Sequence, residues 1–178
     1  MRRNWLMSLS FVLLVSAAAL GASRQEIEIK VEATLERFAE EVTGGARLLQ
    51  GAEGALVFPS VKKGALIVGG AYGEGALVED GAFTGYYSIA SASVGLQFGG
   101  QSSARVLLFL TEEALQDFKT SDGWEVGVDA DVVLVEMGAG AEITTKTAKE
   151  PVLAFVFGQK GLLAGIDLGG SKISPIRR

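Results

Sequence analysis

The stretch from Gly54 to Gly100 constrains the fold more than any other part of the chain. It holds 11 of the 24 glycines in the sequence, and these separate short apolar runs. Runs this short, interrupted by the expected turns Pro59-Ser60 and Asp80-Gly81, predict antiparallel strands and not helices. Repeated glycine inside strands indicates bulges and close approach of neighbouring backbones. The stretch therefore predicts a tightly curled sheet.

A long helix is predicted before this sheet, over Ser23–Leu49, because no proline occurs there and no glycine precedes Gly44. Ser23 is the expected N-cap, and Gly44-Gly45 is expected to end or kink the helix. Apolar residues recur at helical spacing in one stripe, made of Ile27, Val31, Leu35, Phe38, Val42 and Leu49. The opposite side is acidic, whereas helices that bind anionic membrane surfaces are rich in Lys and Arg. The pattern favours a helix packed on the sheet.

The second half of the chain predicts more strands and one short helix. Strands are expected at 104–110, 126–135, 152–157 and 162–168, the last two joined by a hairpin at Gly158–Gly161. Thr111 is the expected N-cap of a helix that includes Ala114–Lys119, and Ser171–Arg178 is expected to be a tail. The fold class is therefore α+β. One domain over residues 23–178 is expected, with a mostly antiparallel sheet curled into a barrel or sandwich, a long N-terminal helix and a short internal one.

Composition excludes several kinds of chemistry. The 178 residues contain no cysteine and no histidine, so disulfides, common zinc sites and histidine bases are absent. The formal charge of −5 argues against a nucleic-acid partner, which requires a basic surface. The glycines of Gly69–Gly75 lack the Gly-Lys-Ser/Thr of a phosphate loop and precede an apolar strand pattern, so no nucleotide and no cofactor is expected.

The N-terminus has the pattern of a secretory signal peptide over residues 1–22. Arg2-Arg3 precede the apolar run Trp5–Ala19, and a small-residue stretch follows, with cleavage expected after Gly21 or Ala22. The arginine pair leaves general and twin-arginine export both open. Ser23 stands where a lipoprotein would need its acylated cysteine, so a periplasmic or secreted protein without a lipid anchor is expected. Removal of residues 1–22 takes away two arginines and no acids, which leaves 14 basic against 21 acidic residues, a charge of −7.

Several motifs resemble the SYLF domain family. They are Phe58-Pro59-x-Val61-x-Lys63-Gly64, Val68-Gly69-Gly70-x-x-Gly73-x-Gly75, Tyr86-Tyr87-Ser88, Ser93-x-Gly95-x-Gln97-x-Gly99, Asp122-Gly123-Trp124 and Gly161-Leu162-x-Ala164-Gly165. The similarity runs from about Ala33 to Ile176 and is greatest to exported bacterial members. Eukaryotic members have Trp-Ser at the position of Tyr87-Ser88, and a basic N-terminal helix where this one is acidic.

The resemblance implies a non-enzymatic domain that binds lipid, as an anionic phospholipid or a phosphoinositide-like headgroup at a membrane surface. Lys62-Lys63 and Lys160 are expected at exposed turns beside glycines, and together with other basic residues they are the candidate headgroup contacts. Aromatic residues are the candidate apolar contacts. These lipid-binding candidates are Lys62, Lys63, Arg105, Lys160, Lys172, Tyr86, Tyr87 and Trp124. Some eukaryotic members of the family bind actin, so a structural or protein-interaction domain without lipid binding is the alternative.

One pair of carboxylates raises the question of a catalytic or metal-binding site, independently of the resemblance. Asp129 and Asp131 are two residues apart in the predicted strand 126–135, which places both carboxylates on one face. Such a pair suits a divalent cation or acid–base hydrolysis. A solvated strand face explains the pair without any chemistry and is the favoured interpretation, so we expect no catalytic residue and no metal.

Overall fold

The computed structural model describes residues 21–64, 68–94, 101–135, 150–158, 161–162 and 168–178. It opens with helix α1 (Arg24–Glu41), which the side chain of Ser23 caps by accepting a hydrogen bond from the Glu26 amide at 3.1 Å. Gly44, at φ +79°, separates α1 from the short helix α2 (Gly45–Gly51). The predicted N-cap and glycine break are confirmed. The expected single helix to Leu49 is divided into two.

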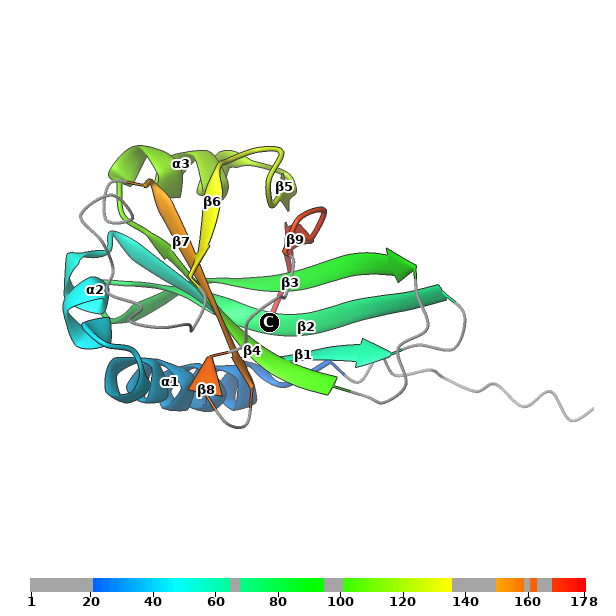
Figure 1. Ribbon diagram of the computed structural model, residues 1–178, viewed down its shortest axis with the longest axis horizontal. Coiled ribbons are helices and arrows are strands. Elements are labelled where there is room, and N and C mark those ends of the chain that lie inside the picture. Colours follow the sequence, from blue (N-terminus) through cyan, green and yellow to red (C-terminus); the bar gives the residue numbers. More distant parts are fainter. Residues whose placement is uncertain (1–20, 65–67, 95–100, 136–149, 159–160, 163–167) are drawn as a thin grey trace, which may run out of the picture.

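The strands form one curled, mostly antiparallel sheet, a half-barrel (Figure 1). Their order across the sheet is β5-β9-β3-β2-β1-β4-β7-β6, with β8 beside β7, and only β6 and β7 are parallel among these pairs. The strands are β1 (Gly54–Gly64), β2 (Val68–Glu79), β3 (Ala82–Val94), β4 (Gln101–Phe109), β5 (Trp124–Glu125), β6 (Val132–Val135), β7 (Val152–Gly158), β8 (Gly161–Leu162) and β9 (Lys172–Pro175). The predicted α+β class and curled sheet are confirmed.

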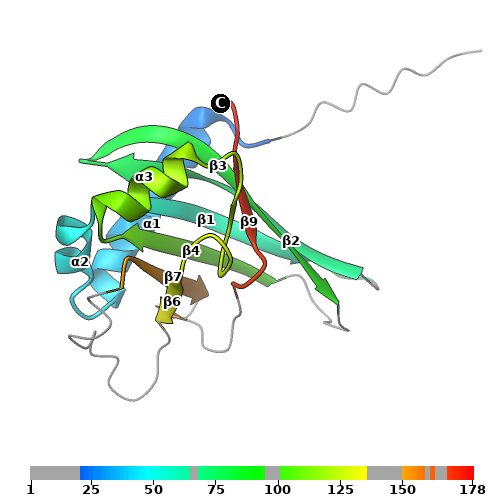
Figure 2. The ribbon, with the colours of Figure 1, turned by 90° about the horizontal axis from the view of Figure 1, so that it is seen from above.

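The sheet has an apolar layer on each face. Helix α1 packs on one face, where Ile27, Val31 and Phe38 meet Val57, Val106 and Phe155. Helix α3 (Glu112–Thr120), capped by Thr111 as predicted, contributes Leu115 and Phe118 to the other layer. Figure 2 shows the two helices on opposite sides of the strands. We call these the α1 face and the α3 face. Among the described residues, no helix has the length and hydrophobicity needed to cross a bilayer.

Of the two turns expected in the glycine-rich stretch, one is confirmed and the other is wrong. Asp80 and Gly81, both at positive φ, join β2 to β3 as expected. The expected turn at Pro59-Ser60 is wrong: β1 continues through it with a register shift against both neighbours. A bulge tolerates proline because the bulged residue needs no ladder N–H donor.

Two other predictions at the C-terminal side are wrong. The alternation from Val126 to Ala130 forms a turn, with Gly127 at φ +82°, and not a strand. The expected tail contains β9, which pairs with β3 and β5. The hairpin at Gly158–Gly161 is confirmed by the pairing of its two ends. The period-two pattern of Val94–Gly99 and most of the strand expected over 162–168 lie outside the described residues.

Candidate functional site

Arg105 is the most unusual candidate residue. It lies in the middle of β4, opposite Phe58 of β1 and Val156 of β7, and both neighbours belong to the apolar layer of the α3 face. The residue is only 5% exposed. Its Nε and Nη1 atoms are buried and have no hydrogen-bond partner in the part of the chain that the structure describes. A cationic group thus stands in an apolar layer without a counter-ion among those residues.

Burial has a direct electrostatic consequence for this side chain. It lowers the pKa of the Arg105 guanidinium from its ordinary value, because removal from water penalises the charged form. An arginine nevertheless stays protonated at neutral pH, because the guanidinium is not deprotonated in proteins under these conditions. The group therefore keeps its charge, and it attracts any anion that can approach it more strongly than an exposed arginine would.

Tyr87 and Trp124 belong to the same α3 face, in an aromatic cluster. The Tyr87 ring lies 4.8 Å from that of Phe118, and Phe118 lies 5.6 Å from Trp124. Trp124 is buried, and Phe109 of β4 closes the cluster at 6.1 Å from it. Burial, followed by the nearby charge of Glu79, raises the pKa of Tyr87. Trp124 is thus a core residue of the fold.

Tyr86 points to the opposite side, because successive strand residues alternate between faces. Its hydroxyl donates a hydrogen bond to Glu28 of α1, and the guanidinium of Arg24 lies 5.6 Å from its ring centre. Burial, then the bond to Glu28, raises the pKa of Tyr86, while the same bond lowers the pKa of Glu28. Tyr86 therefore joins the helix to the sheet, and it does not share a surface with Tyr87.

Lys62 and Lys63 are strand residues and not the turn residues expected from the sequence. Lys62 is exposed in β1 between Tyr72 and Ser102, on the α1 face. The pKa of Glu26 is lowered chiefly by its hydrogen bond with Lys30, and the charge of Lys62 is the smallest contribution. Lys63 pairs with Ala71 and Gln101 through its backbone. Lys172 is exposed in β9, opposite Ala90 and Glu125. Lys160 lies outside the described residues.

The predicted contacts therefore do not form one cluster. Arg105, Tyr87 and Trp124 lie on the α3 face, whereas Lys62 and Tyr86 lie on the α1 face. A single headgroup cannot contact both sets through the sheet.

A comparison with protein families finds a match in the second half of the chain. Residues 90–177 match the family Ysc84, described as Las17-binding protein actin regulator. This match supports the SYLF resemblance over those residues, and the family is one of non-catalytic binding domains. A comparison with curated proteins finds no match.

The Ysc84 match covers part of the candidate set. It begins near the end of β3 and includes Arg105, Trp124, Lys160 and Lys172. It does not include helix α1, Lys62, Lys63 or the two tyrosines. Of the matched candidates that the structure describes, Arg105 alone is a buried charge.

The expected carboxylate pair is wrong in its geometry. Asp129 lies in a turn, where its side chain accepts a hydrogen bond from the Glu125 amide at 2.5 Å, and Asp131 follows as an exposed residue. They are not on one face of a strand. Within the described ranges, no group of three acidic residues is placed to hold a metal ion. Asp129 has a structural role as the residue that closes this turn.

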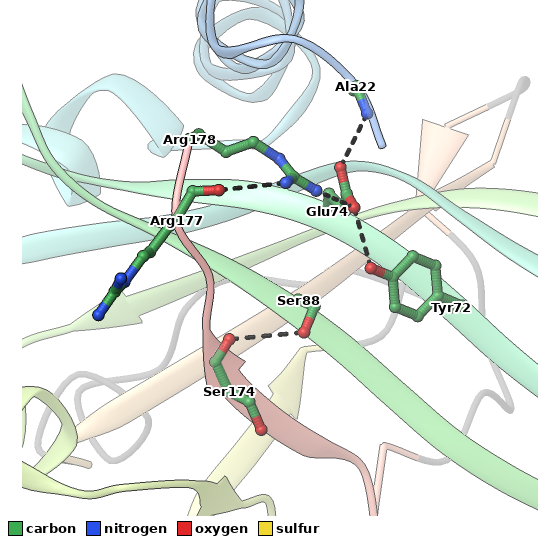
Figure 3. A network of polar contacts seen from close by, with 7 residues as sticks. All are labelled: Ala22, Tyr72, Glu74, Ser88, Ser174, Arg177 and Arg178. Atoms are coloured by element: carbon green, nitrogen blue, oxygen red, sulfur yellow. Dashed lines mark hydrogen bonds and ion pairs between the residues drawn. The ribbon is translucent and has the colours of Figure 1, made fainter. Parts of the chain in front are cut away.

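The sequence did not point to Glu74, which the structure makes the centre of a polar network (Figure 3). Glu74 lies in β2 on the α1 face and accepts hydrogen bonds from Tyr72 at 2.9 Å and from the backbone of Ala22 at 3.0 Å. Arg178 adds an ion pair to the same carboxylate. The local sequence contains only one acidic residue between two glycines of the strand, which does not indicate a polar network.

Proposed function

We propose that this protein is a non-enzymatic, exported protein that binds an anionic lipid headgroup, with Arg105 as its charged centre. The observation that supports the proposal is the buried Arg105 guanidinium, whose Nε and Nη1 lack an acceptor within the described residues. Leaving a charged donor buried and unpaired costs free energy, so the arrangement favours a ligand that supplies the acceptor. Phosphate and carboxylate oxygens are the acceptors that form the strongest bonds with guanidinium.

The apolar surroundings favour an amphiphile over a free inorganic anion. Phe58, Leu107 and Val156 flank Arg105 on the same face. A free phosphate would lose its water shell against these side chains with little return. A headgroup attached to hydrocarbon would place its charge on Arg105 and its first carbons against the apolar neighbours, burying surface from water. A phospholipid or a phosphoinositide-like lipid has this chemistry.

Exposed lysines have a secondary part in this proposal. Lys62 and Lys172 are exposed, and Lys62 lies on the face opposite to Arg105, so these lysines add a general attraction to an anionic surface and do not share the headgroup of Arg105. The exported form is acidic, with 14 basic against 21 acidic residues and a charge of −7, but screening limits charge interactions to about 8 Å at physiological salt. We expect each lysine to contribute far less than Arg105, because exposed charges keep their water. The signal-peptide pattern of residues 1–22 supports the export part of the proposal.

Vesicle co-sedimentation tests the proposal. The protein is mixed with zwitterionic vesicles and with vesicles that also contain an anionic phospholipid or a phosphoinositide, at low and moderate salt. Arg105→Gln is expected to weaken anionic-vesicle binding by about tenfold or more, since a charged hydrogen bond contributes about 1.5–3 kcal/mol. Arg47→Gln is the matched control, because it removes the same charge from an exposed position of α2. Equal binding by Arg105→Gln and wild type, with both folded, would contradict the proposal.

A second candidate function is protein binding without lipid. The description of the matching family, which names Las17 binding and actin regulation, favours it. Co-sedimentation with actin filaments in place of vesicles separates the two. Binding to filaments together with no binding to any vesicle would support the second candidate and exclude the first.

A further inference from the structure

Both ends of the described chain meet on one side chain. Glu74 is 10% exposed at its side chain, and its Oε2 accepts a hydrogen bond from the backbone N–H of Ala22 at 3.0 Å. Its Oε1 accepts from the Tyr72 hydroxyl and from the guanidinium of Arg178 (Figure 3). The two oxygens are thus divided between the segment before α1 and the segment after β9. The network joins positions 52 and 104 residues from Glu74.

We propose that the chain is cut between Gly21 and Ala22, and that Glu74 then binds the new α-ammonium group of Ala22. The inference rests on the export included in the proposed function. A signal peptidase would hydrolyse this peptide bond with one water molecule. The carbonyl carbon of Gly21 leaves as a carboxylate on the removed peptide. The nitrogen of Ala22 stays on the protein and is an ammonium at neutral pH, because the ordinary pKa of an α-amino group is about 7.7–8.0.

The sequence around the bond agrees with this position. Signal peptidases require small residues at the first and third positions before the cut. A cut after Gly21 places Gly21 and Ala19 at those positions. A cut after Ala22 places Leu20 at the third position, where a small residue is needed.

Electrostatics distinguish the two cuts more sharply. After a cut at Gly21, the neutral N–H of Ala22 becomes a cation already 3.0 Å from a carboxylate oxygen, which converts an ordinary hydrogen bond into a charge-assisted one. Arg178 does not compete, because it binds the other oxygen. A cut after Ala22 would remove the donor to Oε2. It would also place the new cation on Ser23, the N-cap of α1, where the helix dipole disfavours positive charge.

The position of the cut is tested on the full chain. The complete protein is expressed in a bacterial host, the exported form is isolated, and its N-terminal residue is identified by mass spectrometry. We expect Ala22. A chain that begins at Ser23 would overturn this inference and leave export intact. An uncleaved chain would overturn the inference together with the export part of the proposed function, whereas lipid binding is tested separately by the vesicles.

The role of Glu74 is tested on the same exported protein. Selective acetylation of the α-amine removes the charge and is expected to lower the melting temperature by about 2–4 °C. In Glu74→Gln the same acetylation is expected to change the melting temperature by much less. Glu79→Gln is the matched control, since Glu79 lies in the same strand but pairs with Lys119, and it should retain the full effect of acetylation. An acetylation shift that is as large in Glu74→Gln as in wild type would overturn the assignment of Glu74.

Discussion

Glu74 and Arg105 are two charged residues set in the interior of one sheet, and their surroundings are opposite. They lie in β2 and β4, the two strands that flank β1, and they point to opposite faces. Glu74 has three donors, from Ala22, Tyr72 and Arg178. Arg105 has two buried nitrogens without an acceptor in the described part of the chain. Glu74 is therefore hydrogen-bonded on both oxygens, whereas Arg105 lacks acceptors among the described residues.

The contrast separates a structural role from a binding role. A buried charge with all its partners fixes the elements that supply them, here the two ends of the chain. A buried charge without partners lowers the stability of the free protein, and it is tolerated where an external group completes it. We therefore expect changes at Glu74 to lower stability, and changes at Arg105 to raise stability and weaken binding.

Among substitutions around Glu74, the largest loss of stability is expected from Gly75→Ala. Gly75 lies against the bulge of β1, where an added Cβ would fall 1.9 Å from the Val57 carbonyl oxygen and 2.8 Å from the Phe58 ring. The backbone must move to relieve this overlap, which would displace Glu74 as well. We expect a loss of about 3 kcal/mol or more in the free energy of unfolding. Urea denaturation measures it.

Gly51→Ala is the control for this substitution. Apart from its chain neighbours and its own helix backbone, no atom of the described residues lies within 4 Å of the position of its Cβ, at the end of α2, so the change is expected to be smaller than about 1 kcal/mol. If both alanine variants unfold at the same urea concentration, the close packing of β2 on the bulge does not hold Glu74 in place.

Arg105→Met is expected to act in the opposite direction. Methionine fills similar space without a charge, so the cost of the unpaired guanidinium disappears. We expect the free protein to gain about 1–3 kcal/mol in the free energy of unfolding while it loses binding to anionic vesicles. Urea denaturation in lipid-free buffer measures the gain, with an unchanged dependence on denaturant showing that the native fold is retained.

Arg47→Met controls for the loss of a positive charge from an acidic protein, because Arg47 is exposed on α2. It should leave stability within about 0.5 kcal/mol of wild type. If Arg105→Met were less stable than wild type, the guanidinium would already be compensated in the free protein, and Arg105 would be a structural residue like Glu74.

The parts of the fold that the sequence predicted depend on local signals. Ser23 and Thr111 were recognised as N-caps because capping is decided within four residues. Asp80-Gly81 was recognised as a turn because both residues accept positive φ. The parts that failed depend on distant partners. The segment after Ser171 has no strong strand pattern, and it becomes β9 because the free edge of β3 is available to pair with it.

In the candidate site, too, some features follow from the local sequence and others depend on distant residues. Alternation along β3 already implies that Tyr86 and Tyr87 face opposite sides of the sheet. The burial of Arg105 also follows from its place inside an apolar strand. Its lack of an acceptor does not follow, because acceptors can arrive from any segment that crosses β4. Glu74 was missed for that reason too, since two of its three donors come from the chain ends.

The smallest effect in the comparison is expected from Arg178→Gln, which removes one of the three donors to Glu74. The side chain of Arg178 is 24% exposed, so part of its pairing is already screened by water. We expect a loss of about 1 kcal/mol in the free energy of unfolding, or about 2–4 °C in melting temperature. Differential scanning calorimetry at low and moderate salt measures it, and the loss should shrink as salt increases.

Arg177→Gln gives this prediction its control. Arg177 is the exposed neighbour of Arg178, and its side chain has no partner among the described residues, so its loss should change the melting temperature by less than about 1 °C. A larger loss from Arg178→Gln means that the ion pair with Glu74 holds the C-terminal segment against β2. Equal losses would mean that the pairing of β9 with β3 holds the segment alone. In that case Glu74 would be anchored mainly by Ala22 and Tyr72, and the contrast with Arg105 would depend on the other end of the chain.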